Sequence, residues 1–286
     1  MNTPVETLPL RPDHRRHLVI VRAGARSCHR HWHYEDRARS WDLLVNVWDG
    51  TSGHGQCEYV SHAGANKLQG VQAILRVNPH LLEAYETFWL VDDDIETTAD
   101  EIEQAFDIFS AYELWVAQPA LRQDSNYNFV THMADPRYLL RFVDHVEVMM
   151  PMFSREALRR CLDTFDRTQS SWGIDCLWWP LLGHPRDRFA IIDATPMHHT
   201  KPADEGNGPF YRKLLARGID ARTEMERLLA ENGLTLWQPT VFSGVPDPHR
   251  ARRERWREAF SPFGLRMALY RSQLKPLRRL LRAIRA

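Results

Sequence analysis

The chain has 286 residues, of which 43% are hydrophobic and 26% charged, ordinary values for one large α/β domain with or without an appendage. It has no apolar run near the ~18 residues that cross a bilayer, and its first residues lack the apolar core of a signal peptide. We therefore expect a cytoplasmic protein. Its four cysteines show no CxxC spacing, so we expect reduced thiols rather than disulfides or a zinc ribbon.

Charge is unevenly distributed although the net charge is zero. Residues 250–286 contain 12 Lys and Arg against two Glu, a charge of +10, so the rest of the chain carries −10. An acidic body with a basic tail is not the profile of a nucleic-acid-binding domain, so we expect no nucleic-acid partner. The pattern predicts instead that the tail has its own partner, such as an anionic surface.

Two buried strands are the first elements expected along the chain. Residues 1–16 are rich in Pro and polar residues, which predicts an irregular lead-in. Apolar runs at His17–Arg22, ending near Gly24, and at Trp41–Trp48 predict the strands. Between them, Ser27–His33 holds three histidines but no carboxylate, so a polar loop or helix start is favoured there over a metal site.

A helical pattern then begins near Asn66 and continues until Pro79 interrupts it. Lys67 lies in its first turn, where a buried cation beside a helix N-terminus could contact phosphate. A solvated lysine fits the same pattern, and both interpretations remain open at this stage.

The central motif is a short apolar run, Phe88–Val91, that stops at three consecutive carboxylates, Asp92, Asp93 and Asp94. The run is typical of a buried strand, and ligands of open α/β sheets bind outside the carboxyl ends of the strands. Adjacent carboxylates repel one another unless a cation or hydrogen-bond donors offset the repulsion. Hard oxygen ligands at a strand end suit Mg²⁺ or Mn²⁺ with substrate phosphates, and we favour this over a solvated acidic turn.

The rest of the chain alternates between helical and strand patterns, as expected for an α/β fold. The further elements predicted are a helix over 99–112, a strand over 115–119, a strand-rich stretch over 141–150, a helix over 155–165, a helix starting near Asp175, a strand over 190–193, an amphipathic helix within 206–233, and a linker over 239–248.

Three further positions are candidates for chemistry. Glu147 falls inside an apolar run, where a carboxylate is usually paired or functional because burying it alone is costly. Asp175 lies at a predicted helix start, as a cap or as a catalytic group. His198 and His199 follow a late strand and could offer a neutral imidazole to a cation, or be structural.

The C-terminal tail, residues 266–286, is basic and amphipathic and is interrupted at Pro276. An apolar stripe with arginines opposite predicts docking on a membrane surface. Packing on the body or on a partner is the alternative.

Taken together, the motifs resemble a known family. They are, in order, Trp89–Glu96, Ala117–Pro119, Val146–Ser154, Trp172–Asp175 and Asp193–Thr200. With them the chain resembles the family catalogued as domain of unknown function 707, which includes plant proteins labelled "lysine-ketoglutarate reductase trans-splicing related". The resemblance covers roughly Leu18 to Lys201. That family is similar in layout to GT-A glycosyltransferases, whose DxD motif binds a divalent ion and a nucleotide-sugar diphosphate.

The resemblance implies a GT-A-like fold, an α/β Rossmann-like mixed sheet flanked by helices. It places the catalytic domain at residues 17–238, after a lead-in over 1–16. Residues 239–286 would then be a linker followed by the basic amphipathic tail.

The resemblance also implies site residues. A site for Mn²⁺ or Mg²⁺ would use Asp92, Asp94 and His199, with Asp94 as the direct ligand, and Asp93 and Lys201 would lie near the diphosphate. The other residues implied are Arg22, Gly24, Asp49 and Lys67 at the nucleotide, Asp175 as general base on the acceptor hydroxyl, and Glu147 and Trp172 on the acceptor side.

The function implied is a metal-dependent glycosyltransferase of polysaccharide biosynthesis, which moves a sugar from a nucleotide-sugar donor to a glycan or lipid-linked acceptor. A carboxylate base implies inversion at the anomeric carbon. Through its tail the protein would be peripheral at the inner face of a membrane. A non-catalytic nucleotide- or glycan-binding protein remains an alternative, whereas an aspartyl phosphatase is disfavoured because two predicted strands precede the acidic motif.

Overall fold

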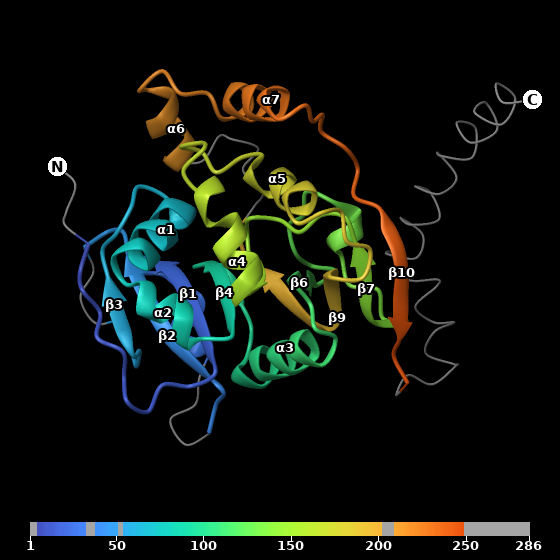
Figure 1. Cartoon of the computed structure of the whole chain (residues 1–286), viewed down its shortest axis with the longest axis horizontal. Helices are drawn as coiled ribbons and strands as arrows, with labels where there is room; N and C mark the ends of the chain where they lie inside the picture. Colours follow the sequence, from blue (N-terminus) through green and yellow to red (C-terminus); the bar gives the residue numbers. More distant parts are fainter. Residues whose placement is uncertain (1–4, 33–37, 51–53, 202–208, 249–286) are drawn as a thin grey trace, which may run out of the picture.

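The computed structural model describes residues 5–32, 38–50, 54–201 and 209–248. They form a mixed sheet with helices on both faces (Figure 1). The strands are β1 (His17–Ala23), β2 (Trp41–Val47), β3 (Tyr59–Ser61), β4 (Thr87–Asp92), β5 (Ile95–Glu96), β6 (Val116–Leu121), β7 (Tyr138–Val143), β8 (Met152–Ser154), β9 (Phe189–His199) and β10 (Val241–Pro246). The predicted α/β class, a mixed sheet flanked by helices, is confirmed.

Helices lie in several of the connections between these strands. They are α1 (Lys67–Val77), α2 (Pro79–Ala84), α3 (Ala99–Ala111), α4 (Arg155–Cys161), α5 (Ile174–Leu181), α6 (Pro209–Leu215) and α7 (Ala221–Glu231), with 3-10 turns η1 (Cys28–His31), η2 (Val130–His132) and η3 (Leu162–Thr164). Among the described residues, none of them is long and apolar enough to cross a membrane.

The strand order is β10-β7-β9-β6-β8-β4-β1-β2-β3, with β5 paired to β9 outside this path. β1 pairs in parallel with both β2 and β4, and Arg22 lies opposite Asp92 in the register of β1 and β4. Because these strands run in the same direction, their carboxyl ends share one edge of the sheet. The acidic turn therefore lies beside the loop that follows β1.

Side chains of the sheet alternate between two apolar cores, as the period of two in a strand requires. In β4, Phe88 and Leu90 pack with α1, α2, α4 and α5, whereas Trp89 and Val91 pack with α3 on the other face. All four side chains are buried, and burial of each stabilises the fold by roughly 1.5–3 kcal/mol.

The stretch 141–150, predicted to be strand-rich, is a strand only as far as Val143. Beyond it, side chains rather than a neighbouring strand bind the backbone amides. Glu147 N donates to Gln118 Oε1 at 2.7 Å, and Val148 N donates to Asp175 Oδ2 at 3.3 Å. This segment consequently folds as a loop at the sheet edge.

The linker predicted over 239–248 is wrong for its central part, because β10 pairs antiparallel with β7 in the main sheet. Gly244 is there for close packing rather than for flexibility. A Cβ on it would lie 2.6 Å from the ring of Tyr138. The remainder of the predicted tail, from residue 249 onward, lies outside the described residues.

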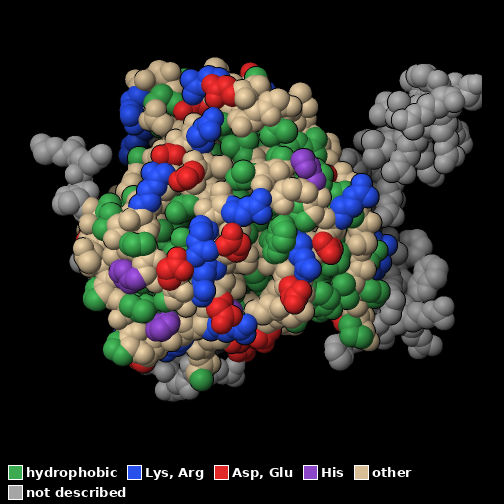
Figure 2. Space-filling view, in the orientation of Figure 1, with side chains coloured by type: hydrophobic (Ala, Val, Ile, Leu, Met, Phe, Trp, Pro, Cys, Tyr) green, Lys and Arg blue, Asp and Glu red, His purple; other side chains and the backbone are tan. Residues whose placement is uncertain are grey.

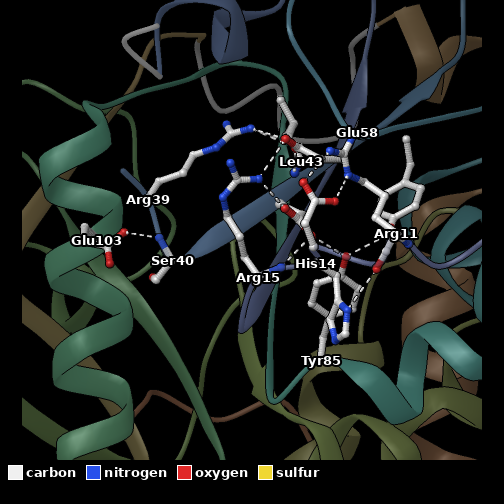
Figure 3. Close-up of polar contacts among 12 residues, drawn as sticks. Arg11, His14, Arg15, Arg39, Ser40, Leu43, Glu58, Tyr85 and Glu103 are labelled. Carbon is white, nitrogen blue, oxygen red and sulfur yellow. Dashed lines mark hydrogen bonds and ion pairs between the residues drawn. The ribbon is translucent and has the colours of Figure 1, made fainter. Parts of the chain in front are cut away.

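The described part of the lead-in, residues 5–16, contains no helix or strand, and it is fixed to the sheet by a polar cluster at the amino ends of β1 and β2 (Figure 3). Arg15 Nη1 lies 2.6 Å from Asp42 Oδ1 and 3.0 Å from Glu58 Oε1. Tyr85 Oη donates to Asp42 at 2.6 Å, and Arg39 binds Glu58. Because Asp42 is fully buried, these partners offset the cost of its desolvation.

Surface charge is mixed. Figure 2 shows basic and acidic side chains interspersed over one face of the molecule. Exposed ion pairs such as Arg159 with Glu83 contribute little each, because water screens them.

Candidate active site

The acidic motif forms the turn between β4 and β5, at the carboxyl end of β4. Asp93 connects this turn to the neighbouring loops. Its Oδ2 accepts hydrogen bonds from Gly24 N at 3.2 Å and Trp48 Nε1 at 3.4 Å, and its Oδ1 lies 2.9 Å from Lys201 Nζ. Asp93 is thus an anchor for the turn in this structure.

Asp94 and His199 come together because β5 pairs with β9, in a register that places Ile95 opposite His199. Asp94 Oδ2 lies 3.5 Å from His199 Nε2. His199 Nδ1 lies 3.2 Å from the carbonyl of Asn126, so a proton on Nδ1 is donated to that carbonyl, and Nε2 faces Asp94, to which it donates when the ring is protonated. Burial lowers the pKa of His199, but the carboxylate outweighs this effect and the pKa ends above its ordinary value.

The Asp94 carboxylate fits a cation as well as an imidazole. Its Oδ1 is buried and has no hydrogen-bond partner among the described residues. Burial raises the pKa of Asp94, but the hydrogen bond to His199 brings it below its ordinary value, so the group is ionised. An ionised carboxylate with an unsatisfied oxygen beside an imidazole nitrogen is a donor set that suits Mn²⁺ or Mg²⁺.

Asp92 has a different partner. Its Oδ1 lies 2.8 Å from Nζ of Lys67, which also donates to the carbonyls of Val148 and Met149. Lys67 is buried, and its ammonium group has three acceptors, one for each of its three protons. In this structure Asp92 is a member of an ion pair, and Lys67 joins α1, β4 and the 144–151 loop.

The residues predicted to contact the nucleotide near the end of β1 bind or contact other groups of the protein. Arg22 donates to the carbonyls of Ala63, Gly64 and Ala65, and burial lowers its pKa to about 10. A Cβ on Gly24 would lie 2.8 Å from Asp49 Oδ2 and from the ring of Trp48. Asp49 Oδ2 accepts from Ala25 N at 2.8 Å. The structure brings Gly24 and Asp49 together beside the acidic turn.

Lys201 pairs with Asp93 and Asp94 of the acidic turn rather than with Asp92, and its side chain is 55% exposed. Its Nζ is 2.9 Å from Asp93 Oδ1 and 3.5 Å from Asp94 Oδ2. Of the predicted phosphate-contacting cations, Lys201 is the one with its side chain in solvent.

Asp175 lies in the first turn of α5, after Gly173, whose φ of 79° gives the left-handed turn that starts the helix. Its Oδ1 accepts from Cys176 N at 3.1 Å and its Oδ2 accepts from Val148 N. Burial, with the nearby Glu147 carboxylate, raises the pKa of Asp175 to about 7. A carboxyl group with this pKa can exchange a proton near neutral pH.

Asp175 and the acidic turn are connected by the backbone of one residue, Val148, and by the side chain of Lys67. Val148 donates its N–H to Asp175 and accepts from Lys67 at its carbonyl, and Lys67 pairs with Asp92. The carboxyl group with the raised pKa and the carboxylate–imidazole pair therefore belong to one polar region at the sheet edge.

Glu147 is buried, and both carboxylate oxygens have partners. Oε1 accepts from Asn128 at 2.6 Å, and Oε2 lies 2.9 Å from His132 Nδ1. Its buried carboxylate lies close enough to Asp175 to help raise the pKa of that group.

The sequence pattern did not identify His132 and His145, whose rings stack with centroids 5.4 Å apart. The apolar run around Glu147 predicted a buried partner, but nothing in it identified which residue that is.

Trp172 is half-buried in the loop before α5. Its Nε1 donates to Tyr211 Oη on α6 at 2.9 Å, and the two rings meet edge to face. In the Ser27–His33 segment, where a loop or helix start was favoured, residues 28–31 form η1 capped by Ser27, and both ring nitrogens of His29 have protein partners; His33 lies outside the described residues.

No family model matches the chain, and no curated protein matches it, so the resemblance to the domain of unknown function 707 family stays a prediction. Two solved structures are similar in part. One is TarS 1-349 of S. aureus, at 11% identity over 75% of this chain and 69% of that chain, with a TM-score of 0.40. The other is A197 from STIV, at 12% identity over 64% of this chain and 85% of that chain, with a TM-score of 0.36. Both scores are low, so neither likeness assigns a residue role or an activity.

Proposed function

We propose that the chain is a metal-dependent glycosyltransferase that moves a sugar from a nucleotide-sugar donor to a hydroxyl group of a glycan or lipid-linked acceptor. One observation carries the proposal: two complementary groups share one polar region of the sheet edge. These are the Asp94–His199 pair and the Asp175 carboxyl group, whose pKa is raised to about 7. Lys67 and Val148 connect them.

Asp94 and His199 would hold Mn²⁺ or Mg²⁺, and Asp92 would join them by exchanging its ion pair with Lys67. Such an ion, when bound, stabilises the negative charge that develops on the departing diphosphate. Lys201, already beside Asp93 and exposed, would lie against the same phosphates.

Asp175 would act as the general base. It takes the proton of the acceptor hydroxyl as that oxygen forms a bond to the anomeric carbon of the donor. The bond from the anomeric carbon to the diphosphate oxygen breaks, and the nucleoside diphosphate leaves with the electron pair. Direct displacement of this kind inverts the anomeric configuration.

A non-catalytic nucleotide- or glycan-binding protein is the second candidate. It is favoured by one observation: both carboxylate oxygens of Asp175, the proposed base, accept hydrogen bonds from backbone amides, as in a structural helix cap. This candidate predicts that Asp175→Asn leaves nucleotide binding unchanged and that no acceptor gives turnover.

The test is a thermal-shift panel of UDP, GDP, CMP and dTDP species with and without Mn²⁺, on the wild type and on Asp94→Asn. At a hundredfold excess over its dissociation constant, a ligand raises stability by about 2.7 kcal/mol, which is readily measured. We expect a shift with one nucleotide that requires Mn²⁺ and disappears in Asp94→Asn. A shift that is equal with and without Mn²⁺ would contradict the metal-dependent proposal.

The basic tail extends the proposal to an acceptor at a membrane surface. Removal of residues 262–286 should reduce partitioning onto vesicles that contain anionic lipid, and less so at high salt. Unchanged partitioning would remove the membrane from the proposal.

A further inference from the structure

We propose that His145, Asp175 and Cys176 form a second cation site, one that prefers Zn²⁺, and that Zn²⁺ bound there prevents Asp175 from acting as a base. The binding site stands by itself, whereas its inhibitory consequence rests on the proposed function. Within the described parts of the chain, these three residues are the only group of three or more His, Cys, Asp or Glu whose ligand atoms all lie within 4.8 Å of one another.

The spacing of His145 and Asp175 is that of metal ligands rather than of hydrogen-bond partners. His145 Nε2 lies 3.7 Å from Asp175 Oδ2, which is too far for a hydrogen bond. Two ligands of a tetrahedral Zn²⁺ with bonds of about 2.0–2.1 Å lie about 3.4 Å apart. A shift of a few tenths of an ångström would bring the nitrogen and the oxygen to that separation.

The imidazole of His145 is enclosed by aromatic and imidazole rings. Its ring stacks on His132 and meets the rings of Phe129 and Trp237 at steep angles. Its side chain is 4% exposed, and Nδ1 has no hydrogen-bond partner among the described residues. Nε2 lies 3.7 Å from Asp175 Oδ2, beyond hydrogen-bond distance of that oxygen, so its lone pair is available to a cation.

The Glu147 carboxylate supplies negative charge beside the group, and burial keeps the imidazole in the neutral form that binds a metal ion. The Glu147 carboxylate is close enough to raise the pKa of Asp175, while burial lowers the pKa of His145 to about 3 and keeps its ring neutral. The ammonium group of Lys67 binds the carbonyl of Val148, whereas Asp175 binds the N–H of Val148. The lysine therefore does not occupy this site.

The ligand types distinguish this site from the acidic turn. A thiolate, an imidazole and one carboxylate suit Zn²⁺, whereas the oxygen-rich turn around Asp94 suits Mn²⁺ or Mg²⁺. Burial and the Asp175 carboxylate raise the pKa of the Cys176 thiol, so metal binding releases its proton to solvent as the sulfur coordinates. Three protein ligands leave one position for water.

Cobalt(II) tests the site, because a thiolate bound to tetrahedral Co²⁺ gives charge-transfer and visible bands. The full chain, stripped with a chelator, is titrated with Co²⁺ alongside Cys176→Ser and the matched control Cys161→Ser, which alters a buried cysteine outside the cluster. We expect the bands in the wild type and in Cys161→Ser and their loss in Cys176→Ser. Zn²⁺ should remove the bands, and a large excess of Mg²⁺ should not.

Absence of the bands in the wild type, or their persistence in a folded Cys176→Ser protein, would overturn the site. If Cys176→Ser does not fold, His145→Gln serves in its place, with at least a tenfold weaker Co²⁺ affinity expected and an unchanged affinity overturning the site. The Mn²⁺-dependent nucleotide shift reports on the proposed function separately. If it fails while the cobalt bands appear, the zinc site stands and its inhibitory role falls.

Discussion

The ammonium group of Lys67 lies 2.8 Å from Oδ1 of Asp92 and donates to two backbone carbonyls of the 144–151 loop as well. The lysine that the sequence placed near phosphate thereby acts as an internal cation for the acidic motif. It holds the carboxyl end of β4 against the loop that also positions Asp175.

Replacement of Lys67 with methionine should lower the free energy of unfolding by about 2–3 kcal/mol, because two carbonyls and a carboxylate lose their donor. The Asp92 side chain is 40% exposed, which limits the cost, since water can reach the carboxylate. Urea unfolding measures the change. Arg76→Met, on the same helix but in an exposed ion pair with Asp163, is the control and should cost no more than about 0.5 kcal/mol. Equal losses in the two variants would contradict the internal role of Lys67.

Turnover should depend on the ionisation of Asp175. Because its pKa is raised to about 7, kcat/KM should fall as pH decreases below about 7 and level off above it. Asp175→Asn should lower kcat by about 10²- to 10⁴-fold and leave the nucleotide-dependent thermal shift unchanged. Asp163→Asn, at an exposed carboxylate, is the matched control. Retention of the donor's anomeric configuration in the product would exclude this role for Asp175.

His17 should make the protein less stable in acid. It is buried against the ring of Phe106, and burial lowers its pKa from 6.5 to about 4. Between pH 6.5 and 4, His17 therefore binds a proton in the unfolded chain but not in the folded chain. The free energy of unfolding that is present above pH 6.5 is lost as pH falls toward 4. The loss from this residue amounts to at most about 3 kcal/mol.

His17→Phe should flatten the dependence of unfolding free energy on pH in this window, and urea unfolding at several pH values would show it. Because the pKa of His145 is also lowered, the slope should decrease rather than vanish. His31→Phe, at an exposed histidine, should leave the slope unchanged. A His17→Phe slope equal to that of the wild type would refute the assignment.

The packing of β10 on β7 can be tested at Gly244. A side chain there meets the Tyr138 ring, so Gly244→Val should cost about 1–3 kcal/mol, whereas Ser243→Val, at the exposed neighbour, should cost little. Thermal unfolding compares the two. Similar melting temperatures would favour the linker that the sequence predicted for this segment.

Strands β1, β2 and β4 and helices α1 and α3 are encoded locally. Their apolar runs, their periodicity and stop signals such as Pro79 act over a few residues, so the sequence alone predicted these elements. The position of the acidic motif at the carboxyl end of a buried strand followed from the same local pattern. The sequence failed at β10, where a segment with Pro and Gly joins the sheet because Gly244 fits against Tyr138.

Only the tertiary structure decided which groups meet. The pairing of β5 with β9 brings His199 to Asp94, and the loop after β7 brings His145 to Asp175. The same packing assigns Lys67 to Asp92 and not to solvent. Strand pairing and burial bring together residues that are far apart in the chain, and the free energy of these contacts depends on the whole packed core. Local pattern therefore predicts which residues can do chemistry, whereas packing determines their partners.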